Sequence, residues 1–418
     1  MAGGSGKRMG HHLPKQLLRV GHVPMLVHLL DLAECIQIDV VLVLSQANHL
    51  MILEYLIGSS ELEKLEHNLY TYRRIRVWVA IQDIANGTGG ALIAARDRVF
   101  LSDSYNLDLS INHQILVLSA DVPLLSTHSA LTMLEMLRVN LDLKCVVYAQ
   151  EREDPHGYGR IMMSPKGEVS IVEQKDIVID VVEQVKLINT GIYAFNARSL
   201  FEALFHINAN NAQREYYLTD VPKIIQRDEG IGTITLYKKN SIIDWDETMG
   251  ANTPNQLEQI KSEYQKKFQI LDLVRETDMT HSTLVEYLKC LSELTTVGLE
   301  YSTESIDRVR DFLLRTCQND KSVFIIGYDG MVIGTFSILI EPKVIHQMSS
   351  VAHVEDVVII ERFRGSGLGK KIMAFVERFC QNHSQPIYKI ILECSDDVIG
   401  FYEKNGYRRV GNSMRLDL

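Results

Sequence analysis

Short apolar runs rich in β-branched residues alternate with helical segments from about residue 38 to residue 240. The runs IDVVLVLS, IRVWVAIQ, ILVLSAD and CVVYAQ are each followed by turn or helix signals. Strands that alternate with helices usually lie in a parallel sheet whose faces the helices cover. The pattern therefore predicts an α/β domain built on a parallel sheet.

A polar, helix-favouring segment, NQLEQIKSEYQKK, follows Pro254, and the strand pattern then restarts at FQILDLV. A chain of 418 residues exceeds the usual length of one domain, about 100–200 residues, so more than one hydrophobic core is expected. We place a first domain at residues 1–253, a helical linker at 254–266 and a second domain at 267–418.

Composition narrows the classes of partner. The formal net charge of −10 argues against a nucleic acid, because proteins that bind polyanions generally carry a basic face. The six cysteines show no CxxC pairing, which argues against a zinc site or a disulfide framework. No apolar run approaches the roughly 18–20 residues of a membrane span, and the N-terminus lacks the order of a signal peptide. We expect a cytoplasmic protein with no membrane partner.

A glycine-rich basic segment, AGGSGKRMG, begins at Ala2. Such loops let backbone N–H groups approach phosphates, and Lys7 and Arg8 add positive charge. Glycine-rich termini are also often merely flexible, so this segment does not decide the function alone.

Six further motifs follow in order: HLPK, LSADVPLL, GYGRI, IVEQKD, INTGIYAF and NNAQREYYLTD. With the glycine-rich segment, this set resembles the uridyltransferase domain of bacterial bifunctional N-acetylglucosamine-1-phosphate uridyltransferases over residues 1–253. The resemblance implies a Rossmann-like nucleotidyltransferase domain. It also implies transfer of UMP from UTP to N-acetylglucosamine-1-phosphate, with Mg²⁺ as the cofactor.

The same resemblance assigns site residues in four groups. The triphosphate would be held by Gly4, Gly6, Arg8 and Lys15, with the two cations stabilising charge at the α-phosphorus. The metal ligands would be Asp121 and Asn252. The uracil would be read by Gln82, Gly87 and Thr88, and the sugar would be bound by Gly159, Glu173, Asn189 and Thr190.

Three features depart from that family. A central strand precedes the family's glycine loop, whereas here the loop directly follows Met1. We therefore expect unpaired backbone beside the phosphate loop. Lys7 and Ala85 also differ from the commonest family pattern, which bears on nucleotide selectivity.

In the second half, VFIIGY and MVIGTFSILI predict a hairpin around Asp329-Gly330. The strand HVEDVVII is followed by a glycine-rich turn and an amphipathic helix, an order that suits pyrophosphate binding. The segments KVIHQMSSVAHVEDVVI, RGSGLGKKI, YKIILEC and GFYEKNGY resemble the GCN5-related N-acetyltransferase superfamily, most of all its eukaryotic-type glucosamine-6-phosphate N-acetyltransferases, over residues 267–418.

This second resemblance implies an α/β acetyltransferase domain that uses acetyl-CoA and forms a homodimer. The cosubstrate's pyrophosphate would lie on the turn made of Arg364, Gly365, Ser366, Gly367, Leu368 and Gly369. Glu355 would act as the base or orient a water, Asp356 would position the amine, and Tyr402 would meet the departing sulfur. The two acidic side chains should point to opposite faces of the strand and so should not share one role. Lys389 and Glu393 would contribute to binding the sugar phosphate.

The sequence thus predicts a bifunctional enzyme that acetylates glucosamine-6-phosphate and makes UDP-N-acetylglucosamine. The bacterial bifunctional family carries a β-helix of hexapeptide repeats as its second half, and no such repeat occurs here. Two alternatives stay open. The fusion could act on a different amino sugar, or the first domain could be a non-catalytic sugar-nucleotide sensor attached to an active acetyltransferase.

Overall fold

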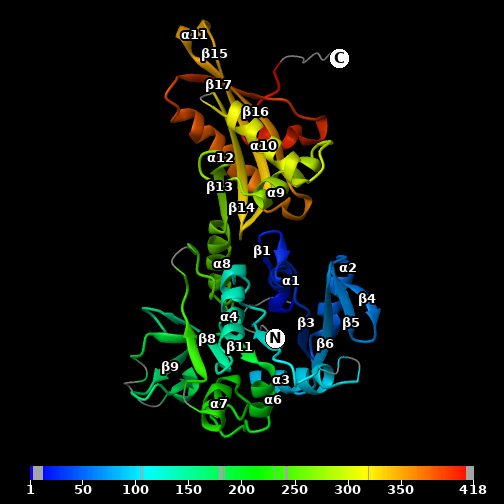
Figure 1. The fold of residues 1–418 in the computed structure, drawn as a ribbon, viewed down its shortest axis with the longest axis vertical. Helices are drawn as coiled ribbons and strands as arrows, with labels where there is room; N and C mark the ends of the chain where they lie inside the picture. The colour runs from blue at the N-terminus through cyan, green and yellow to red at the C-terminus, as the bar shows by residue number, and fades with distance from the viewer. Residues whose placement is uncertain are drawn as a thin grey trace. The chain divides into compact units, whose positions relative to one another are not determined.

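The computed structural model divides into two compact units, Met1–Lys266 (unit 1) and Lys267–Leu418 (unit 2). Figure 1 shows the fold of each unit along the chain. The structure describes residues 1–2, 13–103, 105, 107–177, 182, 184–230, 232–240, 243–318 and 320–410. In this part of the chain, no helix is long and apolar enough to cross a membrane.

The first sheet of unit 1 has four strands in the order β3-β6-β5-β4. These strands are β3 (Val40–Ser45), β4 (Glu63–Glu66), β5 (Leu69–Tyr72) and β6 (Ile75–Gln82). The two predicted strands β3 and β6 are parallel neighbours, while β4 and β5 form an antiparallel extension. Most of β6 is buried, because its apolar side chains lie in the hydrophobic cores on both faces of the sheet.

The second sheet has the order β10-β9-β11-β8-β12, with β7 paired to β11. Its strands are β7 (Gln114–Val117), β8 (Cys145–Glu151), β9 (Gly159–Met163), β10 (Val169–Val172), β11 (Leu187–Asn196) and β12 (Ile234–Tyr237). Only the β12–β8 pair of this sheet is parallel. The prediction of a parallel sheet is therefore wrong here. The β9–β10 hairpin and the returning strand β11 reverse the chain direction, which sequence periodicity does not reveal.

Helices cover these sheets (Figure 1). In unit 1 they are α1 (Met25–Cys35), α2 (His49–Gly58), α3 (Thr88–Ala95), α4 (Thr127–Val139), α6 (Ala197–Leu204), α7 (Val221–Glu229) and α8 (Pro254–Lys266). The segment predicted as a helical linker is α8, and it packs on unit 1 through the fully buried side chains of Ile260 and Tyr264. Pro254 begins this helix, as its fixed φ favours.

The backbone of Met1 and Ala2, at the start of the glycine-rich segment, is paired, which corrects the expectation of unpaired backbone at these two residues. Ala2 forms a parallel bridge with Leu44 of β3, and its N–H donates to the Val43 carbonyl at 2.8 Å. The Met1 carbonyl accepts from the Ala120 N–H at 2.9 Å, beyond the end of β7. These two residues therefore connect the edges of both sheets.

Unit 2 is built on a five-stranded sheet in the order β13-β14-β15-β16-β17. The strands are β13 (Phe268–Asp272), β14 (Lys321–Tyr328), β15 (Met331–Pro342), β16 (Ser350–Ile359) and β17 (Ile387–Leu392). All neighbours are antiparallel except β16 and β17. The helices are α9 (His281–Ser292), α10 (Thr303–Thr316), α11 (Ile345–Met348), α12 (Leu368–Gln381) and α13 (Ile399–Lys404).

Successive side chains of β14 point to opposite faces of this sheet, and different helices pack on each face. Val323 and Ile325 lie in the core that α9 and α10 contribute to. Phe324 points the other way and stacks in an aromatic cluster with Phe336 of β15 and Phe375 of α12. The predicted hairpin is also present, because Asp329 and Gly330 join β14 to β15 with φ of 49° and 83°, the positive values that such tight turns need.

Candidate active sites

Three polar side chains from distant parts of the sequence meet at one point of unit 1. Lys15 opens the short 3₁₀ turn η2 (Lys15–Leu17), Asp121 follows β7, and Asn252 precedes α8. The Lys15 ammonium contacts the Asp121 carboxylate and donates to Asn252 Oδ1 at 3.0 Å. The side chains of Lys15 and Asp121 are only 12% and 13% exposed. The structure thus brings Lys15, which is expected at the phosphates, to the two residues that are expected to bind the metal.

The oxygens of Asp121 and Asn252 suit a magnesium ion. Both converge on one cationic group, and magnesium commonly takes one or two protein oxygens plus phosphates and waters. Among the described residues, no group of three or more His, Cys, Asp or Glu side chains could hold a metal. A magnesium ion here would therefore take its other ligands from phosphates and waters, and the pair of residues is a candidate metal site on the chemistry of its oxygens.

Local hydrogen bonds fix this pair. The Ser119 hydroxyl donates to Asp121 Oδ1 at 2.5 Å, and the Ala251 N–H donates to the Asp121 carbonyl at 2.9 Å. The Asn252 N–H donates to Gln256 Oε1 at 2.9 Å, within the first turn of α8. The segment that carries Asn252 is thereby joined directly to the one that carries Asp121.

A buried carboxylate anchors the same segment. Glu247 is fully buried and accepts hydrogen bonds from the Ser126 N–H at 2.8 Å, the Ser129 hydroxyl at 2.5 Å and the Tyr148 hydroxyl. Burial, and secondarily this carboxylate, raise the pKa of Tyr148 above its usual value. Glu247 could not be predicted from the sequence, because no motif marks which glutamate is enclosed by the fold.

The residues expected to read uracil lie together where β6 meets α3. The Gln82 amide donates to Asn86 Oδ1 at 2.8 Å and to the Gly87 carbonyl at 3.0 Å. Gly87 caps α3 with φ of 99°, and a Cβ there would lie 2.5 Å from the Tyr216 carbonyl oxygen. Thr88 accepts from the Leu218 N–H at 3.1 Å. Only glycine fits at position 87 without strain.

Part of the expected sugar pocket also assembles. Gly159 pairs with Asn189 across β9 and β11, and Glu173 directly follows β10. The Thr219 hydroxyl donates to Glu173 Oε1 at 3.0 Å. Burial raises the pKa of Glu173, and this hydrogen bond partly opposes the shift. Thr219 lies in the motif NNAQREYYLTD, but the sequence analysis gave it no role.

Thr190 has a different environment from its neighbour Asn189. Its hydroxyl donates to the Tyr148 carbonyl of β8 at 2.8 Å, beside the point where the β11–β8 register shifts. Thr190 therefore shapes the strand through backbone contacts. The triphosphate residues Gly4, Gly6 and Arg8 lie outside the described residues.

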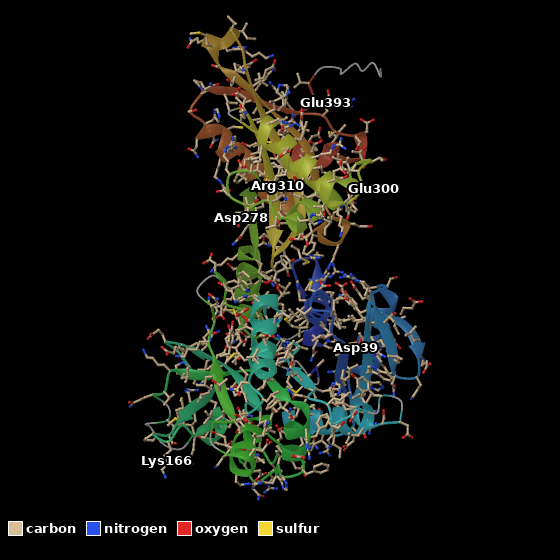
Figure 2. The ribbon with its side chains drawn as sticks, in the orientation of Figure 1. Asp39, Lys166, Asp278, Glu300, Arg310 and Glu393 are labelled. Atoms are coloured by element: carbon tan, nitrogen blue, oxygen red, sulfur yellow. The ribbon has the colours of Figure 1, made fainter. Side chains whose placement is uncertain are left out.

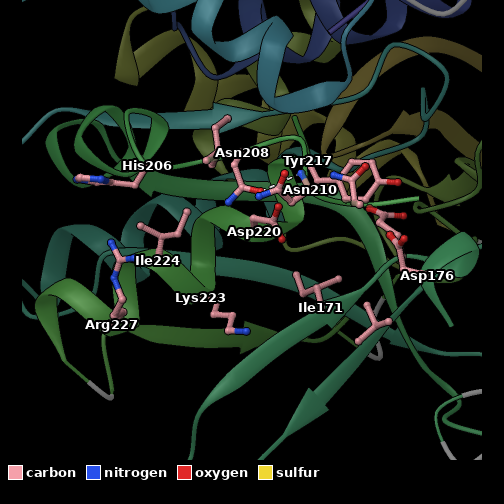
Figure 3. A pocket seen from close by; sticks show the side chains of 14 residues that line it. Ile171, Asp176, His206, Asn208, Asn210, Tyr217, Asp220, Lys223, Ile224 and Arg227 are labelled. Atoms are coloured by element: carbon pink, nitrogen blue, oxygen red, sulfur yellow. Dashed lines mark hydrogen bonds between the residues drawn. The ribbon is translucent and has the colours of Figure 1, made fainter. Parts of the chain in front are cut away.

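A cavity of about 460 Å³ opens beside Glu173 (Figure 3). Asp176 lies toward one end, while His206 and Arg227 lie toward the other. Burial raises the pKa of Asp220, which also lines the cavity, and Lys223 opposes that shift. The mixture of carboxyl, amide and basic groups suits a polar ligand.

In unit 2, the two candidate acids lie at a bulge in β16. Asp356 has φ of 54°, and the register with β15 shifts between Thr335 and Ser337. The Ser337 hydroxyl donates to the Glu355 carbonyl at 3.4 Å. The prediction that the two acidic side chains face opposite ways assumed a regular strand, and this bulge breaks the alternation.

The bulge coincides with the end of pairing between β16 and β17. The parallel register runs to Val354 and Leu392, whereas β15 continues to pair with β16 as far as Ile359. The strands part just before Glu355. Burial, and secondarily Asp356, raise the pKa of Tyr287 of α9 above its usual value, which places this ring near the bulge.

The predicted phosphate turn leads into α12. Gly365 and Gly367 have φ of 76° and 88°, and Gly367 is the N-cap of the helix. The Ser366 hydroxyl donates to the Phe363 carbonyl at 2.6 Å, and Leu368 is buried. The first N–H groups of a helix have no intrahelical acceptor, so the turn offers donors to an anion.

Arg364 is held at the start of this turn. Its guanidinium donates to the Ile359 carbonyl at 2.9 Å and to Glu293 Oε2 at 3.0 Å. At the other side, a Cβ on Gly369 would lie 2.7 Å from the Phe401 ring. Gly369 therefore allows α13 to pack against the turn.

Tyr402 follows Phe401 in α13, and their ring centroids lie 5.0 Å apart. Burial, with a smaller effect of Cys394, raises the pKa of the Tyr402 phenol above 10. Lys389 is exposed on β17 with its ammonium 5.4 Å from the Tyr388 ring centroid. Glu393 is exposed just beyond the strand (Figure 2).

Comparisons with known proteins follow the same division. Residues 1–239 match the family model described as nucleotidyl transferase, and residues 286–407 match the acetyltransferase (GNAT) family. The bifunctional protein GlmU of Streptococcus gordonii is 33% identical over 254 residues, covering 60% of this chain and 48% of that protein. GlmU of Streptococcus thermophilus is 34% identical over 256 residues with the same coverage. The chain thus spans about half the length of the curated relatives it matches.

Two solved structures are also similar. The glucosamine-6-phosphate N-acetyltransferase of Arabidopsis thaliana aligns with 30% identity and a TM-score of 0.32, over 36% of this chain and 97% of that chain. A putative glucose-1-phosphate thymidylyltransferase of Bacillus anthracis aligns with 19% identity and a TM-score of 0.47, over 62% of this chain and 92% of that chain.

Proposed function

Because the chain belongs to the nucleotidyl transferase family and also carries a GNAT-family acetyltransferase domain, we propose that it catalyses two transfers in UDP-N-acetylglucosamine synthesis. Unit 1 would transfer UMP from UTP to N-acetylglucosamine-1-phosphate. Unit 2 would transfer acetyl from acetyl-CoA to glucosamine-6-phosphate. The observation that carries the proposal is the convergence of Lys15, Asp121 and Asn252 on one point.

In unit 1, an oxygen of the sugar phosphate attacks the α-phosphorus of UTP, and pyrophosphate leaves. Two polyanions must meet, so positioning and charge neutralisation supply most of the catalysis. Lys15, with Arg8, stabilises charge on the phosphates, while Gln82 and the Gly87 backbone read the uracil edge. Asp121 and Asn252 would hold a magnesium ion, which would neutralise phosphate charge when bound.

In unit 2, the amine of glucosamine-6-phosphate attacks the acetyl carbonyl. Glu355, directly or through a water, takes the amine proton, and Asp356 orients the amine. Tyr402 donates a hydrogen bond or its proton to the departing thiolate, because the phenol, whose pKa burial raises, is protonated at neutral pH. The turn from Arg364 to Gly369 holds the pyrophosphate of the cosubstrate.

The two reactions are not consecutive. Acetylation at unit 2 leaves the phosphate on carbon 6, whereas unit 1 requires it on carbon 1. A separate phosphate-moving enzyme must act between them.

Both donor substrates are metabolites of the cytoplasm, and four of the six cysteines are buried thiols, which supports that compartment as the place of reaction.

We also propose a homodimer formed through unit 2. The strand β17 is an edge of the five-stranded sheet, and its six residues are all at least partly exposed. A paired or covered edge would remove this exposed backbone. Lys389 and Glu393, on or just beyond that strand, would then contribute to sugar-phosphate binding near the partner subunit.

The decisive experiment assays both half-reactions on one preparation of the full chain. We expect pyrophosphate release from UTP plus N-acetylglucosamine-1-phosphate, and CoA thiol release from acetyl-CoA plus glucosamine-6-phosphate. Asp121→Ala should abolish the first reaction and spare the second, and Glu355→Ala should do the reverse, so each variant controls for the other. Loss of both activities from either change would contradict the two-site assignment. UTP binding without pyrophosphate release would favour the sensor alternative.

A further inference from the structure

The Lys15 ammonium occupies the position between the two proposed metal ligands. It contacts the Asp121 carboxylate through Oδ2 and donates to Asn252 Oδ1 at 3.0 Å. The other Asp121 oxygen, Oδ1, accepts from the Ser119 hydroxyl at 2.5 Å. Both oxygens that would face a divalent cation are therefore already turned toward a monovalent one from the chain itself.

An ammonium and a metal ion cannot share this position. Magnesium binds its oxygens at about 2.0–2.1 Å, closer than the N–O distance of a hydrogen bond, and two cations that close repel each other strongly. Lys15 and Asp121 are mostly shielded from water, which weakens screening of that repulsion. A metal ion can enter only if the ammonium leaves.

The ammonium can leave without disturbing the fold. The backbone around Lys15 is fixed, because Leu17 is buried and the Gln16 amide donates to the Ala2 carbonyl at 2.9 Å. The lysine stem has four rotatable carbons, so its end can swing while its Cα stays in place. A triphosphate offers the ammonium several anionic oxygens in exchange for one carboxylate.

The two acidic groups earlier in the segment that carries Asn252 have partners of their own. Asp246 pairs with the Arg152 guanidinium at 2.6 Å, and Glu247 is enclosed by its three hydrogen-bond donors. Asp121 is thus the carboxylate whose charge Lys15 balances in the absence of substrate.

We propose that Lys15 is a resident cation that keeps free divalent metal out of the Asp121–Asn252 site until a nucleoside triphosphate draws the ammonium onto its phosphates. Metal and nucleotide then bind together. The same lysine excludes the metal from the free site and stabilises the phosphates of the bound nucleotide. This inference rests on the proposed function of unit 1, because it takes Asp121 and Asn252 as the metal ligands.

The test measures Mn²⁺ binding to the full chain without nucleotide, by the loss of the electron paramagnetic resonance signal of free Mn²⁺. Wild type should bind weakly. Lys15→Met should bind Mn²⁺ about tenfold or more tightly, because a charge-assisted contact that competes with the metal is removed. Lys15→Gln should behave alike, so that poor folding of one variant does not decide the result.

A matched control is Lys238→Met, the same change at a lysine that pairs with the exposed Glu151 at 2.9 Å. It should bind Mn²⁺ as wild type does. Adding Asp121→Ala to Lys15→Met should abolish the gain, which assigns the new binding to this site.

A second arm adds UTP and compares wild type with Asp121→Ala. Protein-dependent Mn²⁺ binding that requires both UTP and Asp121 supports the metal site. If that holds while Lys15→Met binds no tighter than wild type without UTP, the resident-cation role is overturned and the proposed function stands. If Asp121→Ala changes nothing with UTP present, the metal site itself is wrong and both proposals fall.

Discussion

Glu173 is a partly buried carboxyl group at the edge of the cavity in unit 1. Burial raises its pKa above the usual value near 4.5, although the Thr219 hydroxyl favours the ionised form. A raised pKa in the folded state means that folding favours the protonated group. Its contribution to stability is therefore present at low pH and is lost as the pH rises through the folded-state pKa.

This sign gives a prediction for Glu173→Gln, whose side chain cannot ionise. The unfolding free energy of the variant, relative to wild type, should increase from pH 5 to pH 8, as measured by urea unfolding at both values. The control is Glu168→Gln, an exposed residue beside the β9–β10 turn, which should show little change in that difference. A Glu173→Gln difference that is equal at both pH values would contradict the buried, ionisable role.

At this scale, the family resemblance predicted Lys15, Asp121 and Asn252, and the structure brings their polar atoms together. It did not predict which oxygens already have partners. It also did not predict that the Thr190 hydroxyl, expected at the sugar, donates to the Tyr148 carbonyl of β8 beside a register shift in β11. Such local backbone geometry leaves no mark in a motif.

Among the elements, the segment from Glu247 to Asn252 shows how the fold holds a site. Glu247 accepts from the start of α4 and from β8, so one buried carboxylate ties this segment to two elements. Removing this carboxylate would leave its buried hydrogen-bond donors without an acceptor. The resulting loss of folding free energy is larger than the net contribution of the hydrogen bonds themselves.

Glu247→Ala should lower the unfolding free energy of unit 1 by about 2–5 kcal/mol, measured by denaturant unfolding. UMP transfer should fall with it, because Asn252 loses its anchor, while acetyl transfer by unit 2 should persist. Glu258→Ala, on the exposed face of α8, provides the comparison and should stay within about 0.5 kcal/mol of wild type. Equal effects of the two changes would refute the anchoring role.

Element types were easier to predict than their pairing. The Asp329-Gly330 hairpin followed from turn chemistry, and β3 and β6 lie parallel as expected. The antiparallel course of β11 and the bulge at Asp356 did not follow, because both depend on contacts between strands distant in sequence. Bulges cluster where strand pairing ends, and here the parting of β16 and β17 lies at the candidate acids.

For the whole molecule, each unit has its own sheets and cores. We expect residues 1–266 and 267–418, produced separately, to fold and to retain UMP transfer and acetyl transfer respectively. Activity of each half, compared with the full chain at equal concentration, checks this. Cutting instead after residue 253 should weaken the first half, because it removes α8 with the buried side chains of Ile260 and Tyr264. Equal activity from both cuts would show that α8 is dispensable.

The contact between Lys15 and Asp121 also bears on how the stability of the fold depends on the magnesium concentration. In many metalloproteins the ion stabilises the fold, and removal of the metal unfolds the chain. Here the carboxylate finds its counter-charge within the polypeptide. At low magnesium concentration, UMP transfer would then stop while the protein stays folded. Adding magnesium back would restore the reaction.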